Sequence, residues 1–131
     1  RIERQWLPGD EINLDLRMKP AVVLSPPEVA ANRGQLALRR GPLIYCLEKQ
    51  DAAGLDLEIV SLVLESTAAS HAVTEEFDSK LGMYVLKVQA AVKGSDRPTV
   101  PRQVQLIPFF FRANRAPDSR WITWIPCGSG S

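Results

Sequence analysis

The sequence contains few of the side chains that bind metal ions or attack substrates. Its 131 residues include two cysteines and one histidine. Cys46 lies inside an apolar stretch and Cys127 lies near the end, so the pair matches neither a zinc-ligand spacing nor a Cys-x-x-Cys redox motif. We interpret Cys46 as a small buried hydrophobe, and a disulfide between the two cysteines stays open. His71 lacks a partner motif and is interpreted as a surface residue. We therefore predict no catalytic residue and no metal ligand in this chain.

The chain also lacks an excess of charge of one sign and a long apolar segment. Sixteen Lys and Arg side chains are balanced by fifteen Asp and Glu side chains, and no basic stripe stands out. We therefore expect neither a nucleic-acid partner nor an anionic membrane partner. The apolar runs fall well short of the ~20 residues that span a bilayer. Because the chain opens at Arg1 without an initiator Met or a signal-like segment, we expect a cut or processed start. The cellular compartment is not indicated.

What the sequence has in quantity is apolar alternation of period two, which is typical of half-buried strands. Residues 83–92 alternate in this way, whereas residues 43–47 form an unbroken apolar run suited to a strand covered on both faces. No window shows helical spacing, and ten prolines fit loops between strands. The prediction is an all-β fold, an antiparallel, jelly-roll-like β-sandwich with little helix. We expect about nine strands, over residues 2–6, 12–18, 21–24, 34–39, 43–47, 57–65, 83–92, 103–111 and 120–125.

Turn signals divide the chain into three parts. A Pro-Gly-Asp turn at residues 8–10 separates the first two predicted strands, so residues 2–18 are expected to pair as a hairpin. Two adjacent prolines then mark residues 21–27 as an edge strand or connector. Residues 67–76 are ambiguous, with a single helical turn as one alternative. The predicted division is an N-terminal hairpin and connector over 1–27, a β-sandwich over 28–126 and a flexible tail over 127–131.

Three stretches together resemble a known family. Residues 4–18 read R-x-W-x-x-G-D followed by apolar alternation. Residues 38–48 read LRRGPLIYCLE, where the family typically has R-G-P-L-V-Y-C-x-E. Residues 107–115 read IPFFFRANR, where it has P-Y-Y-x-W-A-N-R-G. Over residues 2–126 the chain is therefore similar to the C-terminal β-sandwich region of glycoside hydrolase family 127, the β-L-arabinofuranosidase family.

The third stretch departs from the family pattern. Phe109 and Phe110 stand where the family has tyrosines, Arg112 stands where it has Trp, and Ala116 stands where it has Gly. The missing hydroxyls and indole remove polar groups that a sugar or a neighbouring domain could contact. These differences argue against a binding role for this loop.

The resemblance implies that catalysis takes place outside this chain. Family members are similar in using a zinc-bound cysteine nucleophile, with further cysteines and a glutamate, in an (α/α) barrel that precedes the sandwiches. The sequence has no Glu-x-Cys and no adjacent Cys pair, so we expect zinc only in that barrel and no cofactor here. Two acidic clusters, at residues 56–58 and 75–78, could supply the carboxylates of a glycosidase, which lie about 5–10 Å apart. We interpret them as solvated side chains.

Aromatic rings offer another kind of binding site, because carbohydrate-binding modules stack sugars on exposed rings. Tyr84, Trp121 and Trp124 are the candidates. Trp121 and Trp124 are an odd number of residues apart and so point to opposite faces of a strand, which places one inward and one outward. Core packing, or contact with the missing barrel, is the main alternative for each ring.

Two functions of different classes follow. In the first, the chain is a non-catalytic accessory domain of a glycoside hydrolase that packs against the catalytic barrel of its parent protein. In the second, it is a stand-alone carbohydrate-binding module or small glycan-active protein. We favour the first because no catalytic constellation is present. Residues 2–18 would belong to a preceding sandwich in the resembling family, so we also predict a homodimer through this hairpin when that sheet is missing.

Overall fold

Nine strands and four short 3-10 helices make up the computed structural model, which describes residues 1–64, 70–92 and 100–128. These residues include no α-helix. The strands are β1 (Pro20–Leu24), β2 (Gln35–Arg40), β3 (Leu43–Glu48), β4 (Val60–Val63), β5 (Thr74–Asp78), β6 (Met83–Val92), β7 (Arg102–Pro108), β8 (Trp121–Ile122) and β9 (Ile125–Gly128). The 3-10 helices are η1 (Ala30–Asn32), η2 (Lys49–Asp51), η3 (Ser70–Ala72) and η4 (Phe109–Phe111). Over these same ranges, no helix has the length and apolar character that crossing a membrane requires.

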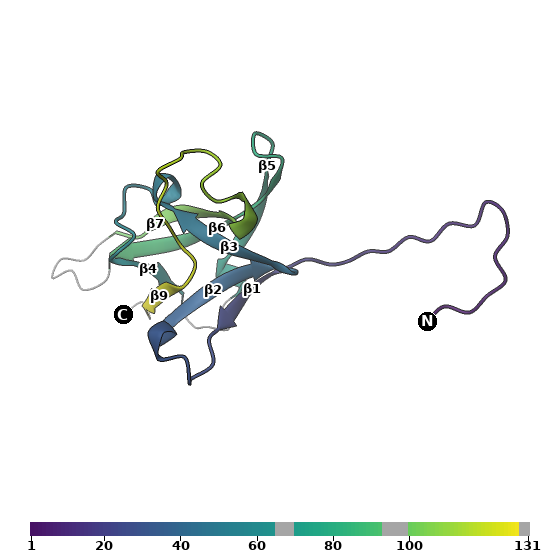
Figure 1. Ribbon diagram of the computed structural model, residues 1–131, viewed down its shortest axis with the longest axis horizontal. Coiled ribbons are helices and arrows are strands. Elements are labelled where there is room, and N and C mark those ends of the chain that lie inside the picture. The colour runs from purple at the N-terminus through teal and green to yellow at the C-terminus, as the bar shows by residue number, and fades with distance from the viewer. Residues whose placement is uncertain (65–69, 93–99, 129–131) are drawn as a thin grey trace.

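The strands close into a six-stranded barrel (Figure 1). Its order is β2-β9-β4-β6-β7-β3, and β3 returns to pair with β2, with Ile44 opposite Arg39. The pairing of β4 with β9 is parallel and the other pairings are antiparallel. The all-β prediction is confirmed, but the predicted sandwich is wrong, because the two sheets that a sandwich keeps apart are hydrogen-bonded at both edges.

The closure depends on a break in the last predicted strand. Residues 120–125 were expected to form one strand, but they divide between β8 and β9. β8 pairs with the end of β3, while β9 crosses to β2 and β4. A strand that changes partners in this way joins two sheets, and nothing in the local alternation announces the change.

Alternation along the strands produces two apolar clusters. On β6, Leu86 and Val88 point into the barrel, and Val85 points to its outer face. The barrel interior holds the main core, which includes Leu36, Leu38, Tyr45, Leu47, Leu62, Leu86, Val88, Leu106 and Ile125. The second cluster lies on the outer face and consists of Cys46, Val85 and Ile107, with Leu81 and Phe111 packed against them. Residues 45–47 are therefore covered on both faces, as predicted, whereas Leu43 is half-buried and Ile44 is exposed at the start of the same run.

Most other strand predictions are confirmed within a few residues. β6 coincides with the predicted strand over 83–92, and β1 is an edge strand paired with β2. β5 is a strand that the sequence analysis missed in the ambiguous segment, because its side chains are polar or exposed rather than alternating in polarity. The helical turn expected as an alternative there forms at η3. Residue 65, the last of the predicted strand over 57–65, lies outside the described residues, as do residues 67–69 of the ambiguous segment and residues 129–131 of the predicted tail.

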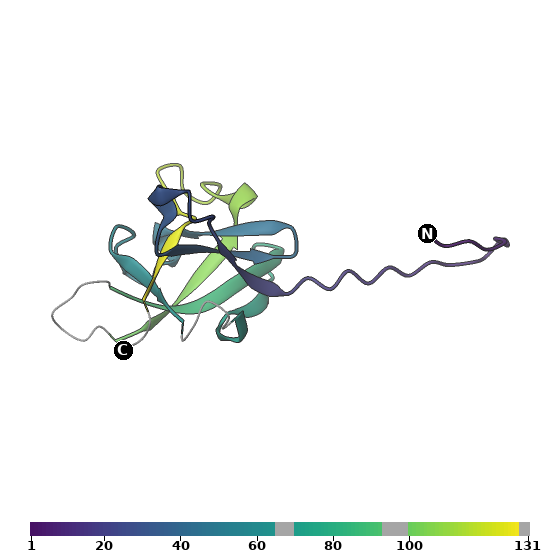
Figure 2. The same cartoon turned by 90° about the horizontal axis from the view of Figure 1, so that it is seen from below.

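The predicted N-terminal hairpin is wrong for this chain. Residues 1–19, which we call the arm, form no strand and extend away from the barrel (Figures 1 and 2). The turn itself is present, since Asp10 N–H donates to Leu7 O at 3.0 Å and Leu7 N–H donates to an Asp10 carboxylate oxygen at 2.9 Å. A turn alone does not pair two strands, because a two-stranded hairpin is marginal without a third strand or a packed face.

Candidate functional site

The β2–β3 hairpin carries the most family-like motif. Gly41 in its turn has φ +56°, a left-handed conformation that favours glycine. A Cβ at this position would lie 2.8 Å from Met18 Cγ, so Met18 packs directly on the turn. The Arg40 guanidinium lies 4.0 Å from the centroid of the Tyr84 ring and also pairs with Glu75. The motif thus ties the arm, β5 and β6 to the start of β3.

The two cysteines are unbridged, and Cys46 has the environment of a core residue. Its side chain is fully buried between Val85 and Ile107. Burial, reinforced by the Glu48 carboxylate, raises the pKa of the Cys46 thiol to about 12. A nucleophilic or metal-binding cysteine needs the opposite shift. The prediction that Cys46 is a small buried hydrophobe is confirmed.

Glu48 at the end of β3 is the centre of a buried polar cluster, which we call the loop clamp. It is 0% exposed. Its carboxylate accepts hydrogen bonds from Ala113 N–H at 2.6 Å, from Arg115 Nη2 at 2.6 Å and from Gln50 Nε2 at 2.7 Å. Arg115 Nη1 also donates to Asp51 Oδ1 at 3.0 Å. The clamp fixes the loop after β7 onto the outer face of the barrel.

The protonation of Glu48 follows from these contacts. Burial by itself would raise the pKa of the Glu48 carboxyl, but the hydrogen bonds from Ala113 N–H, Gln50 and Arg115 outweigh it and hold that pKa below its usual value of 4.5. The sequence analysis missed the clamp, although Glu48 and Arg115 both end motifs that it singled out. The sequence does show that Glu48 follows an apolar run at the end of a strand, which could have indicated a buried charge. It does not show that Arg115 is the residue that pairs with it.

The clamped loop displays aromatic rings. Phe109 and Phe110 are 37% and 62% exposed. The Arg112 guanidinium lies 4.0 Å from the Phe109 ring centroid and 5.2 Å from that of Trp121, which is within the range of cation–π attraction. Arg112 therefore joins the two rings into one surface.

The predicted sugar-stacking residues do not form one platform. Trp121 is exposed and Trp124 is half-buried between β8 and β9, so neither ring lies in the core. Tyr84 is exposed too, and it lies on the side of β6 that carries Leu86, toward the barrel mouth. Trp121 instead lies opposite Glu48, whose side of β3 faces outward with Cys46. The structure therefore brings Trp121 together with Arg112 and Phe109, not with Tyr84.

The acidic residues weighed in the sequence are engaged by other groups. Glu58 binds Arg120 at 2.8 Å, and Asp56 accepts a hydrogen bond from Glu58 N–H at 3.0 Å. Glu76 binds Lys87 at 2.6 Å, and Asp78 accepts hydrogen bonds from two backbone N–H groups of the following turn. His71 is exposed, as expected. These contacts are those of a surface network.

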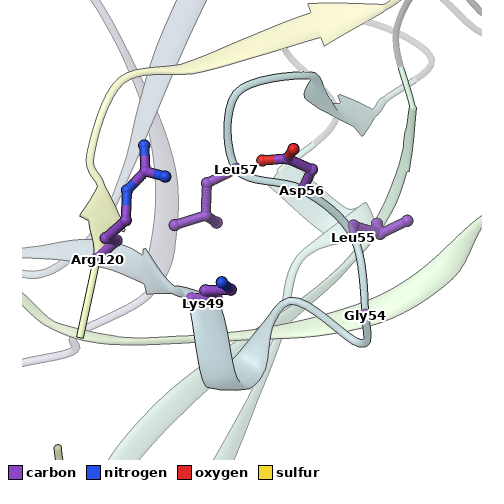
Figure 3. Close-up of a pocket in the computed structure, with 6 residues that line it drawn as sticks. All are labelled: Lys49, Gly54, Leu55, Asp56, Leu57 and Arg120. Atoms are coloured by element: carbon purple, nitrogen blue, oxygen red, sulfur yellow. The ribbon is translucent and has the colours of Figure 1, made fainter. Parts of the chain in front are cut away.

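A shallow hollow of about 240 Å³ lies beside this network (Figure 3). Figure 3 shows Lys49 and Arg120 on one side of the hollow and the Gly54–Leu57 segment on the other. It is lined by Lys49, Gly54, Leu55, Asp56, Leu57 and Arg120. Arg120, one of the two cations that line the hollow, is already paired with Glu58.

Comparison with known proteins decides the family. Residues 20–126 match the model of the glycoside hydrolase family 127 C-terminal domain. The chain belongs to this family. Over 118 residues it is 31% identical to the non-reducing end beta-L-arabinofuranosidase of Bifidobacterium longum subsp. longum, a match that covers 80% of this chain and 18% of that protein.

Solved structures of the family support the same assignment. A GH127 beta-L-arabinofuranosidase from Geobacillus stearothermophilus T6 superposes with a TM-score of 0.63 at 26% identity, over 85% of this chain and 18% of that chain. A GH127 beta-arabinofuranosidase superposes with a TM-score of 0.62 at 25% identity, over 85% of this chain and 17% of that chain. This GH127 C-terminal domain therefore spans less than a fifth of the length of these relatives.

Proposed function

We propose that this GH127 C-terminal domain is a non-catalytic accessory domain of a glycoside hydrolase that acts on β-L-arabinofuranosides. It packs against a catalytic (α/α) barrel carried by another part of the parent protein. The observation that carries the proposal is that the polar side chains of the motif bind other groups of the same domain. Arg40 is paired with Glu75, Tyr45 O–H donates to Tyr84 O at 2.9 Å, and the Glu48 carboxylate holds the 109–115 loop. Groups occupied in this way stabilise a scaffold.

The zinc-thiolate centre implied by the resemblance belongs outside these residues. Cysteine binds zinc as the thiolate, and the fully buried Cys46 has a pKa shifted to favour the protonated thiol. Burial likewise raises the pKa of Cys127. The cysteines present therefore do not fit the group, and no step of the reaction is assigned to this chain.

The proposal is tested by assaying the purified chain with an aryl β-L-arabinofuranoside. We expect no turnover by the chain, and turnover that co-purifies with it would overturn the proposal. A second assay compares the protein continued upstream in its reading frame with and without residues 20–126. Removal of the domain should lower the melting temperature of the remaining part, because a packed apolar face becomes exposed.

Glycan binding is the second candidate, favoured by the exposure of Trp121 and Tyr84 at 40% and 41%. Each ring already has an arginine over it, Arg112 and Arg40 respectively. Calorimetry with arabino-oligosaccharides, using Trp121→Ala and Trp124→Ala as comparisons, separates the candidates. Heat of binding that disappears in Trp121→Ala would favour a binding module.

Homodimerisation through the N-terminal segment is a further proposal about partners. The arm exposes Ile12, Leu14 and Leu16 and has no paired strand in the described residues, so a second arm could supply one. Light scattering should show dimers that disappear when residues 1–19 are removed. A monomer at high concentration would exclude them.

A further inference from the structure

One end of the barrel carries a group of exposed apolar side chains, which we call the arm-end surface. Their exposed fractions range from 37% for Ile44 and Phe109 to 62% for Phe110. Buried cores and scattered single residues account for most apolar side chains of a domain, whereas a contiguous exposed group marks an interface. The surface consists of Ile44, Phe77, Tyr84, Phe109 and Phe110.

The strand register places these residues in two groups at the same end of the barrel. Phe77 is opposite Tyr84, and their rings meet edge to face with centroids 5.3 Å apart. Tyr45 is opposite Pro108, so the next residues on the two sides are Ile44 and Phe109. Leu86 is opposite Leu106, which brings Tyr84 level with the end of β7. The surface therefore consists of the Phe77–Tyr84 pair and the group of Ile44, Phe109 and Phe110, which lie where β5, β6, β7 and β3 reach the same end of the barrel. Tyr84 is on the inward side of β6 with Leu86, and Ile44 is on the outward side of β3 with Cys46.

The arm leaves the barrel at this end. Pro20 at the start of β1 is opposite Arg40, next to the β2–β3 turn, and Met18 packs on Gly41 in that turn. Figure 1 shows the arm departing there, with η1 at the other end of β1. Beyond Met18 the arm continues the same apolar alternation, with Leu14 and Leu16 76% and 70% exposed.

We propose that the arm-end surface docks onto the part of the parent polypeptide that precedes the arm. This inference rests on the proposed function and specifies which face of the domain is covered. The occupant follows from the connection, because the relatives are more than five times as long as the matched region, which covers 17–18% of them. A preceding domain tethered by the arm is held close to this end at a high effective concentration.

The chemistry of the surface fits a protein face. Its rings are phenyl and phenol groups, and the two arginines beside them are already engaged. Arg40 is stacked on Tyr84 and paired with Glu75, and Arg112 lies 4.0 Å from the Phe109 ring centroid and donates to Phe109 O at 3.1 Å. Interfaces between domains are enriched in such aromatic anchors and in arginine. Phe109 and Phe110 carry no hydroxyl group that would bind a sugar, and their rings offer apolar area that would bind a protein.

Hydroxyl-radical footprinting tests the docking. The 131-residue chain and the protein continued upstream in its reading frame are oxidised in parallel, after urea unfolding has shown that each is folded. We expect the peptide with Phe109 and Phe110 to react about tenfold more slowly in the longer protein. Leu24, which is 58% exposed at the opposite end of β1, is the matched control and should react equally in both. Equal oxidation of Phe110 in both proteins would overturn the proposal.

Variants distinguish the possible occupants. Phe110→Ser should lower the melting temperature of the longer protein more than Leu24→Ser does, while both have small effects on the 131-residue chain. Protection in the short chain that grows with its concentration would overturn the proposal in favour of a homodimer. Protection that requires added arabino-oligosaccharide would overturn it in favour of a sugar. Hydrolysis by the short chain would contradict the proposed accessory function, whatever the footprint shows.

Discussion

Strand β6 and the arm carry the same sequence pattern and have opposite environments. In β6, Leu86 and Val88 are 0% and 2% exposed. In the arm, Ile12 and Leu14 alternate with polar residues just as regularly and are 61% and 76% exposed. β6 pairs with β4, β5 and β7, whereas the arm pairs with no strand in the described part of the chain. Alternation therefore specifies which face requires burial, and it leaves open whether the same chain supplies the partner.

The largest expected effect on stability comes from removing the charge of Glu48, which is buried on the outer face of the barrel. Glu48→Ala leaves Arg115 and Ala113 N–H without their acceptor, so the free energy of unfolding should fall by about 4 kcal/mol. Urea unfolding followed by tryptophan fluorescence measures it. Glu76→Ala, which breaks the exposed pair with Lys87, should lower it by less than about 1 kcal/mol. If Glu48→Ala lowered the free energy of unfolding by as little as Glu76→Ala does, the loop clamp would add no more stability than an exposed ion pair.

The next prediction compares an apolar residue of β6 with an apolar residue of the arm. Leu86→Ala creates a cavity in the core and should lower the free energy of unfolding by about 3 kcal/mol. Leu14→Ala removes the same atoms from the exposed arm and should change it by less than about 0.5 kcal/mol. Thermal or urea unfolding of both variants is sufficient. A loss for Leu14→Ala close to that for Leu86→Ala would mean that the arm is packed in solution.

A smaller effect is expected where the arm joins the barrel. Gly41 and Gly82 both have positive φ, +56° and +68°, so an alanine at either position should lower the free energy of unfolding by about 1 kcal/mol. A Cβ at Gly41 would meet Met18, whereas nothing lies within 4 Å of one at Gly82. Only Gly41→Ala should therefore shift the NMR signal of the Met18 methyl group. An unchanged signal in that variant would show that Met18 is not held on the turn.

The smallest expected effect is on the pH dependence of stability. The pKa of Glu48 is lowered in the folded state, so its ionised form stabilises the fold above its unfolded pKa. This contribution is lost as the pH falls from about 4.5 through the folded pKa. Unfolding measured between neutral pH and pH ~3 should therefore show a shallower acid loss in Glu48→Gln than in the unchanged chain. The same slope in both would assign the acid loss to other carboxyl groups.

Local patterns predicted much of the fold and little of the site. Residues 83–92 and 43–47 were identified as strands because alternation and an apolar run are properties of consecutive residues. β5 was missed because Glu75 and Glu76 are polar neighbours on an exposed strand. The hairpin over 2–18 was predicted on equally regular alternation, which shows that a correct pattern does not establish a pairing. Trp121 was identified as a candidate, but its contact with Arg112 was not.

The sequence by itself determined the all-β class, the faces of most strands and the membership of the GH127 family, because each depends on short runs of neighbouring residues. Only the tertiary structure decided that the sheets close into a barrel and that Glu48 binds Arg115, 67 positions further along the chain. It also left the apolar face of the arm unpaired in the described residues. The physical reason is that alternation is a local property, whereas closure and ion pairing depend on which distant segments meet.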